Sequence, residues 1–481
     1  MKTILLIFIL IFASPLMIFA QTFDETGYPE LISGRPVRGE IPLSLEGINY
    51  ATYTMSIDDS VFAVRLSLTG AEQDLDLYVK YGEEIENYDD VDWKSEKDTY
   101  YEELIITRFS DPPLQNGIYF IDAAYQMLRK QEASIPFSLA LEAVPFTVKE
   151  KLVPGKIVRS ALTPESGMAA FFSFEIPKEA ESARIYTFDT SGDVDMIITR
   201  DGFPLSFNDG DYLIETYLSR EEFAFDGIPG KYTIGVFDQV SNAKQVSFSL
   251  YAGLEEYPPA FLLHIPPFPP GSTAFDKMMA PVVEIITKDG RGSGCIISKK
   301  GHVLTNWHVV QDFSGNSSPE IYAAPTFNQH TPPVEVFRIE LIEVDEERDL
   351  AFGQIVSGRY GQPLPTGYVF PFFALKDYRD VSIGEEIFII GYPSVGGTGS
   401  RASITMTRGI ISGFEKTISG GLIKTDGEIN TGSSGGACIT EEGLLIGLPT
   451  RVIGEESSQI GYITPVSGIP GRWRYILQKD R

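Results

Sequence analysis

The chain has 481 residues, of which 43% are hydrophobic and 22% are charged, a composition typical of folded globular domains and not of disordered chains. Its length predicts about three domains of ordinary size. The formal net charge of −27 argues against a nucleic-acid-binding or membrane-surface protein, because both functions need a basic patch. The acidic balance identifies no partner of its own.

Residues 1–20 have the pattern of a signal peptide. Lys2 supplies a positive start, residues 4–12 form an apolar core, and Ala20 offers a small residue before the cleavage point. The alternative is an uncleaved anchor, but the apolar run is shorter than the about 20 residues that span a bilayer. Because no later segment is long enough to cross a membrane, we expect a mature protein that is secreted or periplasmic.

An internal repeat occupies residues 21–147 and 148–254. Three pairs of segments recur in the same order: LISGRPVRG and LVPGKIVRS, DLDLYV and DVDMII, and GIYFIDAAY and GKYTIGVFD. Short runs rich in Val, Ile, Tyr and Phe, in places with alternating apolar and polar residues, predict strands separated by turns. Each repeat is therefore expected to fold as a small β-sandwich.

Each repeat carries an Asp-x-Asp pair within an expected strand: Asp74 with Asp76, and Asp193 with Asp195. Residues two apart in a strand share a face, so each pair could supply carboxylate oxygens to a calcium ion. The alternative is that these carboxylates accept hydrogen bonds from nearby loop backbone. Calcium is the secondary hypothesis, and we expect that no cofactor is required.

Six prolines between residues 255 and 272 predict an extended, stiff linker. Residues 273–481 are again rich in short apolar runs, and only the last few residues show a helical pattern, so a third all-β domain is expected. Cys295 and Cys438 are the only cysteines in the chain. They form either one disulfide, which export would permit, or two buried thiols.

Three residues typical of nucleophilic catalysis occur in order along the third domain. His308 follows the apolar run of GHVLTNWHVV, Asp349 precedes LAFGQI, and Ser434 lies in TGSSGGAC. A lone histidine is usually structural, and a Gly-Ser run is usually a flexible linker. The order His, Asp, Ser is nevertheless that of the chymotrypsin-type triad.

From about residue 285 to residue 470 the chain resembles a trypsin-like serine protease of the HtrA/Deg kind. The resemblance is carried, in order, by GSGCIIS, VLTNWHVV, RDLAF, IGYP, TRGIISG, TDGEINTGSSGGAC, LLIGLPT and GYITPV. It implies two six-stranded β-barrels with the site in the cleft between them. It also implies that His308 is the general base, that Asp349 orients it and that Ser434 is the nucleophile. The two repeats resemble bacterial pre-peptidase C-terminal domains through their D-x-D and G-x-Y strands.

The glycines around Ser434 acquire a role from this resemblance. They permit a tight turn in which the backbone N–H groups of Gly432 and Ser434 point at one spot, the oxyanion hole for the developing negative oxygen. The register G-x-S-G-G makes Ser434, and not Ser433, the nucleophile. Ser433 stands where chymotrypsin-like zymogens carry an Asp, so activation through an ion pair with a new N-terminus is not expected.

The resemblance also places three residues around the pocket for the side chain that precedes the cleaved bond. Glu428, six residues before Ser434, falls at the pocket floor, with Thr450 and Gly461 at the walls. A carboxylate at the floor would favour Arg or Lys in the substrate. The alternative is that Glu428 points to solvent and the pocket takes small apolar residues.

No room for a PDZ domain follows the protease-like segment, so the chaperone activity and cage assembly of HtrA proteins are not expected, and the oligomeric state stays open. We expect an exported serine endopeptidase that acts on polypeptides through an acyl-enzyme intermediate. The alternative function is a secreted binding or adhesion protein whose protease-like domain is degenerate.

Overall fold

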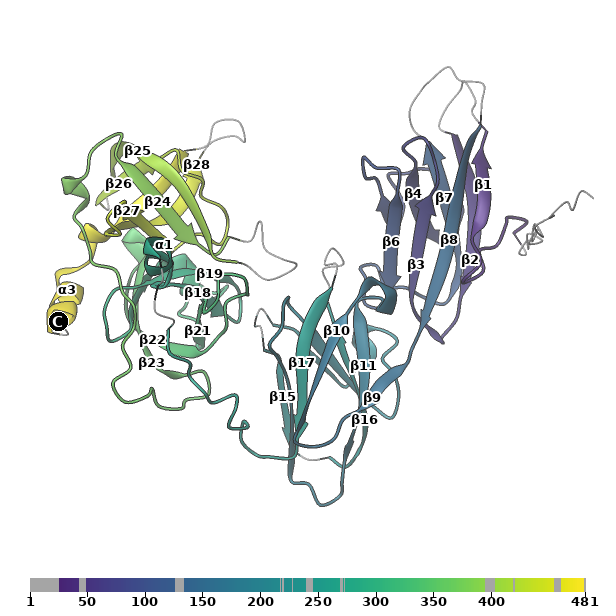
Figure 1. Cartoon of the computed structure of the whole chain (residues 1–481), viewed down its shortest axis with the longest axis horizontal. Helices are drawn as coiled ribbons and strands as arrows, with labels where there is room; N and C mark the ends of the chain where they lie inside the picture. Colours follow the sequence, from purple (N-terminus) through teal and green to yellow (C-terminus); the bar gives the residue numbers. More distant parts are fainter. Residues whose placement is uncertain are drawn as a thin grey trace, which may run out of the picture. The chain divides into compact units, whose positions relative to one another are not determined.

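The structure, a computed structural model, is built mainly from strands and separates into two compact units, Met1–Pro145 and Phe146–Arg481 (Figure 1). The predicted signal peptide lies outside the described residues. Among the residues that are described, no helix is long and apolar enough to span a membrane. The described residues are 26–42, 49–125, 134–216, 218, 220–226, 228–238, 245–268, 271, 273–393, 403–417, 420–453 and 460–479.

The first unit contains two four-stranded antiparallel sheets whose buried side chains form one core. In β3, Val64, Leu66 and Leu68 are buried and alternate with more exposed neighbours, so one face of the strand enters that core. One sheet has the order β1 (Val37–Ile41), β8 (Ile135–Pro145), β3 (Val61–Thr69) and β6 (Glu102–Thr107). The other has the order β2 (Asn49–Ile57), β7 (Gly117–Tyr125), β4 (Asp76–Tyr81) and β5 (Trp93–Ser95).

The second unit begins with another pair of sheets around one core. One sheet has the order β10 (Lys156–Leu162), β17 (Val246–Gly253), β12 (Ser182–Phe188) and β15 (Glu222–Asp226). The other has the order β14 (Tyr212–Ile214), β13 (Asp195–Arg200), β16 (Gly230–Phe237), β11 (Ala169–Ile176) and β9 (Val148–Lys151). Apart from β9, which pairs in parallel with β11, the strand orders match those of the first unit one for one. The repeat in the sequence therefore corresponds to a repeat in topology.

Two closed six-stranded barrels follow, as the sequence predicted (Figure 1). The first runs through β18 (Val282–Thr287), β19 (Arg291–Ile296), β20 (His302–Thr305), β23 (Leu350–Gly358), β22 (Phe337–Asp345) and β21 (Ile321–Pro325). The second runs through β24 (Glu386–Gly391), β25 (Thr405–Thr417), β26 (Gly420–Thr425), β29 (Ile460–Pro465), β28 (Leu445–Ile453) and β27 (Ala437–Thr440).

A shared core holds the two barrels together, because it contains buried side chains from both, among them Leu304 and Phe352 of the first and Ile390 and Leu448 of the second. The ring of Trp473 stacks on Phe352 with ring centroids 5.2 Å apart, which fastens the C-terminal helix to the first barrel. The described helices are α1 (Ala274–Met279), α2 (Trp307–Val310) and α3 (Gly471–Lys479), with short 3-10 turns at Pro164–Ser166, Phe207–Asp209, Glu346–Arg348, Tyr378–Asp380 and Val466–Gly468.

The proline-rich segment packs on the first barrel instead of standing free as a spacer. Ile265 is 6% exposed and belongs to the core of that barrel. The ring of Phe268 lies 6.1–6.3 Å from the rings of Phe337, Tyr368 and Phe370. The Tyr368 hydroxyl donates a hydrogen bond of 2.7 Å to the carbonyl of Pro266. At least residues 265–268 are therefore structural parts of the barrel, although their composition predicted a linker.

Cys295 and Cys438 are both free thiols with no exposed surface. Burial raises the pKa of both thiols, which keeps them protonated and unreactive at neutral pH. Of the two alternatives left open by the sequence, the structure has the buried thiols.

Candidate active site

His308 is presented by a single helical turn between two barrel strands. Trp307, Val309 and Val310 of α2 are buried, so the short helix is anchored on the barrel and His308 is left on its exposed side. The Nδ1 atom of His308 lies 2.7 Å from Oδ2 of Asp349, and the backbone N–H of His308 donates a 3.0 Å bond to Oδ1. The carboxylate therefore contacts His308 through both the backbone N–H and Nδ1, and Nε2 remains available to accept a proton.

Asp349 has a left-handed backbone conformation, which hydrogen bonds from its surroundings help to hold. Its φ of 54° lies in the left-handed region, which costs a non-glycine residue about 1 kcal/mol. The side-chain amide of Asn306 donates to its carbonyl at 2.8 Å and to Oγ1 of Thr450 at 2.6 Å. Thr450 in turn donates to Oδ2 of Asp349 at 3.4 Å. These contacts join the two barrels at the carboxylate and fix its orientation toward His308.

Ser434 lies in a glycine-rich loop that is pinned against the first barrel. The backbone N–H of Ser293 donates a 2.9 Å bond to the carbonyl of Ser434, and the Ser293 hydroxyl donates a 2.7 Å bond to the carbonyl of Gly432. Gly435 has φ of 80°, and a Cβ there would lie 2.3 Å from the carbonyl oxygen of Ser293. Only glycine allows so close an approach. Within this loop Ser433 is 6% exposed, whereas Ser434 is half-buried and lines a cavity.

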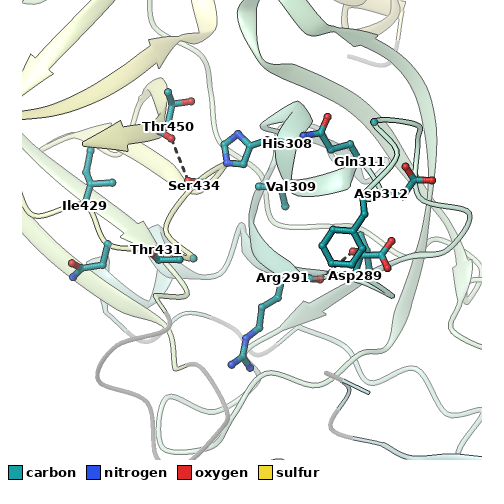
Figure 2. A pocket seen from close by; sticks show the side chains of 16 residues that line it. Asp289, Arg291, His308, Val309, Gln311, Asp312, Ile429, Thr431, Ser434 and Thr450 are labelled. Atoms are coloured by element: carbon teal, nitrogen blue, oxygen red, sulfur yellow. Dashed lines mark hydrogen bonds between the residues drawn. The ribbon is translucent and has the colours of Figure 1, made fainter. Parts of the chain in front are cut away.

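His308 and Ser434 line the same cavity, which has a volume of about 840 Å³ and is bounded by both barrels (Figure 2). The hydroxyl of Ser434 donates a long bond of 3.4 Å to the carbonyl of Thr450 (Figure 2). Gly432, predicted to supply an oxyanion donor, also lines the cavity and has φ of 94°. A second cavity of about 590 Å³ adjoins His308, Asp349 and Thr450. The structure thus places His308 and Ser434 on the first cavity and His308 and Asp349 on the second, with His308 common to both.

Of the three residues predicted to form the substrate pocket, only Thr450 lines a cavity among the described residues. Thr450 lines both cavities. Glu428 is exposed, accepts a 2.9 Å bond from the side-chain amide of Asn430, and is not one of the described residues lining either cavity. Its neighbour Ile429, which the sequence did not single out, is 7% exposed and lines the larger cavity. A Cβ at Gly461 would lie 2.8 Å from the side chain of Ile429, so Gly461 provides the room that the isoleucine fills.

The aspartate pairs of the two sheet pairs are partly buried acids. Burial first, and then the charge of Asp74, raises the pKa of Asp76 to about 6. Burial first, and then the charge of Asp193, raises the pKa of Asp195 to about 9. The described part of the chain contains no group of three or more His, Cys, Asp or Glu side chains arranged to hold a metal ion. Calcium therefore stays a prediction without support in the arrangement of these residues.

Comparisons with known proteins match part of the double barrel. Residues 292–448 match the family model of the trypsin-like peptidase domain. Over 207 residues the chain is 30% identical to Protease Do-like 1, chloroplastic, of Arabidopsis thaliana, covering 41% of each chain. Over 208 residues it is 29% identical to Serine protease Do-like HtrA of Bacillus subtilis, covering 40% of this chain and 41% of that one.

A third relative is Serine endoprotease DegS of Haemophilus influenzae, which is 30% identical over 175 residues and aligns with 35% of this chain and 44% of its own length. The chain thus spans less than half the length of these three curated relatives. The family match at residues 292–448 lies within the double barrel and contains His308, Asp349 and Ser434.

Proposed function

We propose that this chain is an exported serine endopeptidase in which His308, Asp349 and Ser434 form the catalytic triad. The observation that carries the proposal is the 2.7 Å contact between Nδ1 of His308 and Oδ2 of Asp349. Ser434, on a glycine-rich loop, lines the same cavity as His308. The family match and the Do-like and HtrA relatives support the same activity. Two further relatives are named as probable periplasmic serine endoproteases, and residues 1–20 have the pattern of a signal peptide; both observations support export.

The reaction begins with a rotation of the Ser434 side chain. Its hydroxyl leaves the 3.4 Å contact with the carbonyl of Thr450 and turns to Nε2 of His308. His308 then takes the proton while Ser434 Oγ attacks the carbonyl carbon of the peptide bond. Asp349 keeps the proton on Nδ1 of the histidine and stabilises the imidazolium that forms.

The tetrahedral intermediate places a negative oxygen near the backbone N–H groups of Gly432 and Ser434. Each such donor contributes about 3–4 kcal/mol to the stability of the transition state. When the intermediate collapses, His308 gives its proton to the departing amine and an acyl-enzyme on Ser434 is left. A water molecule, activated by the same histidine, then hydrolyses the ester and restores the serine.

We further propose that the side chain preceding the cleaved bond is small and apolar. The buried side chain of Ile429 lies at the wall of the cavity next to Gly461, where a long basic side chain would need space. The exposed carboxylate of Glu428 is already hydrogen-bonded to Asn430.

The two sheet pairs in front of the barrels are proposed to be β-sandwich repeats of the pre-peptidase kind.

Labelling with a fluorophosphonate probe tests the activity. Such a probe reacts with a serine only where a base and an oxyanion hole activate it. We expect labelling of the secreted protein, its loss in Ser434→Ala and in His308→Ala, and its retention in Ser433→Ala. The absence of labelling in the wild type under all conditions would favour the binding protein with a degenerate domain, and equal loss in Ser433→Ala would show that the register is wrong.

A further inference from the structure

The cavity around Ser434 has two ends of different chemistry. One end contains Ile429 and Thr431, from the loop that precedes the serine. The other end contains Asp289, from the turn between β18 and β19, and Asp312, from the segment after α2. Phe313, the residue after Asp312, also lines the cavity. In the view of Figure 2, Ser434 and His308 lie between Ile429 on one side and Asp289 and Asp312 on the other.

The direction of the bound polypeptide follows from the proton transfers. His308 must hand its proton to the departing amine, so the departing part of the substrate lies on the histidine side of Ser434. The chain after His308 leads within five residues to Asp312 and Phe313, which line the cavity beyond it. The acyl part then lies over Ile429, and the residues on the carboxyl side of the cleaved bond extend toward Asp289 and Asp312.

The turn that carries Phe313 is well ordered by hydrogen bonds. Oδ1 of Asp312 accepts 2.8 Å bonds from the backbone N–H groups of Ser314 and Asn316, and the N–H of Asp312 donates a 2.7 Å bond to the carbonyl of Asn316. The ring of Phe313 is nevertheless 89% exposed. A single exposed aromatic ring is ordinary on a protein surface. Here it lines the same end of a substrate cavity as two carboxylates, and such an arrangement suits a cation.

We infer that this end of the cavity, formed by Asp289, Asp312 and Phe313, binds a basic side chain, Lys or Arg, at one of the first two residues on the carboxyl side of the cleaved bond. The inference rests on the proposed endopeptidase function. The cation would pair with the carboxylates while its methylene stem packs against the ring. Arg291 also lines the cavity, but Figure 2 shows its guanidinium directed away from Asp289 and Asp312. The formal charge of −27 favours the approach of basic polypeptides.

The test uses peptides with one acyl part, ending in Val or Ala, followed by Lys, Arg, Leu, Ala or Glu at each of the first two positions after the bond. We expect kcat/KM to be about tenfold higher for Lys or Arg than for Glu, and the difference to shrink at high salt, because the site is open to solvent. In Asp289→Asn with Asp312→Asn the ratio should fall to about two. Asn at position 312 retains the Oδ1 acceptor that orders the turn. The double variant Glu179→Gln with Glu441→Gln, which removes two exposed carboxylates from residues outside both cavities, is the matched control for net charge.

An anilide of the same acyl peptide carries no amino acid after the cleaved bond. Its hydrolysis therefore tests the proposed endopeptidase function separately from the inferred basic preference. Hydrolysis of the anilide without any basic preference in the peptides, or a preference for Leu or Glu, would overturn the inference alone. A basic preference that survives unchanged in the double variant would overturn the assignment to these residues. Failure of both anilide hydrolysis and fluorophosphonate labelling would overturn the proposed function and this inference together.

Discussion

Replacing Ile265 by alanine tests whether the proline-rich segment is part of the protease barrel. The side chain is 6% exposed and packs in the core of the first barrel, so the substitution leaves a cavity among buried apolar side chains. Core substitutions of this kind cost about 2–5 kcal/mol. Because Ile265 lies outside the barrel strands, we expect the lower half of that range, about 2–3.5 kcal/mol. For a domain of this size that is a fall of about 4–14 °C in the melting temperature.

The measurement is thermal unfolding of the full chain followed by tryptophan fluorescence. Two of the three tryptophans, Trp307 and Trp473, lie in the double barrel, so the signal reports mainly on that part. The neighbouring His264 is exposed, and His264→Ala should change stability by no more than about 0.5 kcal/mol. If Ile265→Ala were as harmless as His264→Ala, the segment would be a tether and the packing seen here would not contribute to stability.

Two further predictions concern the pocket and the buried acids. In peptides that vary before the cleaved bond, Val and Ala should exceed Arg and Lys by at least about tenfold in kcat/KM. Ile429→Ala should shift the preference toward larger apolar residues, whereas Glu428→Gln should leave it unchanged; an Arg preference that Glu428→Gln abolishes would restore the basic pocket. The pKa of Asp195 is raised by burial to about 9, so the unfolded chain loses this proton first as the pH rises. The contribution of Asp195 to stability should therefore fall between about pH 4 and pH 9. Asp195→Asn should raise the melting temperature more at pH 8 than at pH 5, and an equal effect at both would refute the raised pKa.

The sequence was informative about features that local patterns encode. Alternating apolar residues and turn residues predicted strands, and the resemblance to trypsin-like proteases implied two six-stranded barrels, both of which the structure contains. The choice of Ser434 over Ser433 came from the glycine register, and the structure leaves Ser434 open to the cavity while Ser433 is buried. The catalytic roles themselves stay predictions until the probe experiments are done.

The sequence did not predict which side chain faces the cavity in the loop before Ser434. Glu428 and Ile429 are adjacent, and which of them faces the cavity depends on the path of the backbone between β26 and the serine loop. A count of six residues back from Ser434 identifies a position along the chain but not an orientation. The proline-rich segment shows the same limit, because proline content predicts an extended backbone but says nothing about the surface on which Ile265 and Phe268 pack.

The geometry of the candidate triad depends on contacts that no spacing in the sequence reveals. His308 and Asp349 come from the first barrel, while Ser434 and Thr450 come from the second, and Asn306 bonds to Thr450 across 144 positions of the chain. The distance from the serine to the histidine is therefore set by how the two barrels pack, through a core of apolar side chains that line neither cavity. Because a close-packed interior transmits small shifts, a change of volume in that shared core should disturb catalysis even though none of its residues touches the substrate.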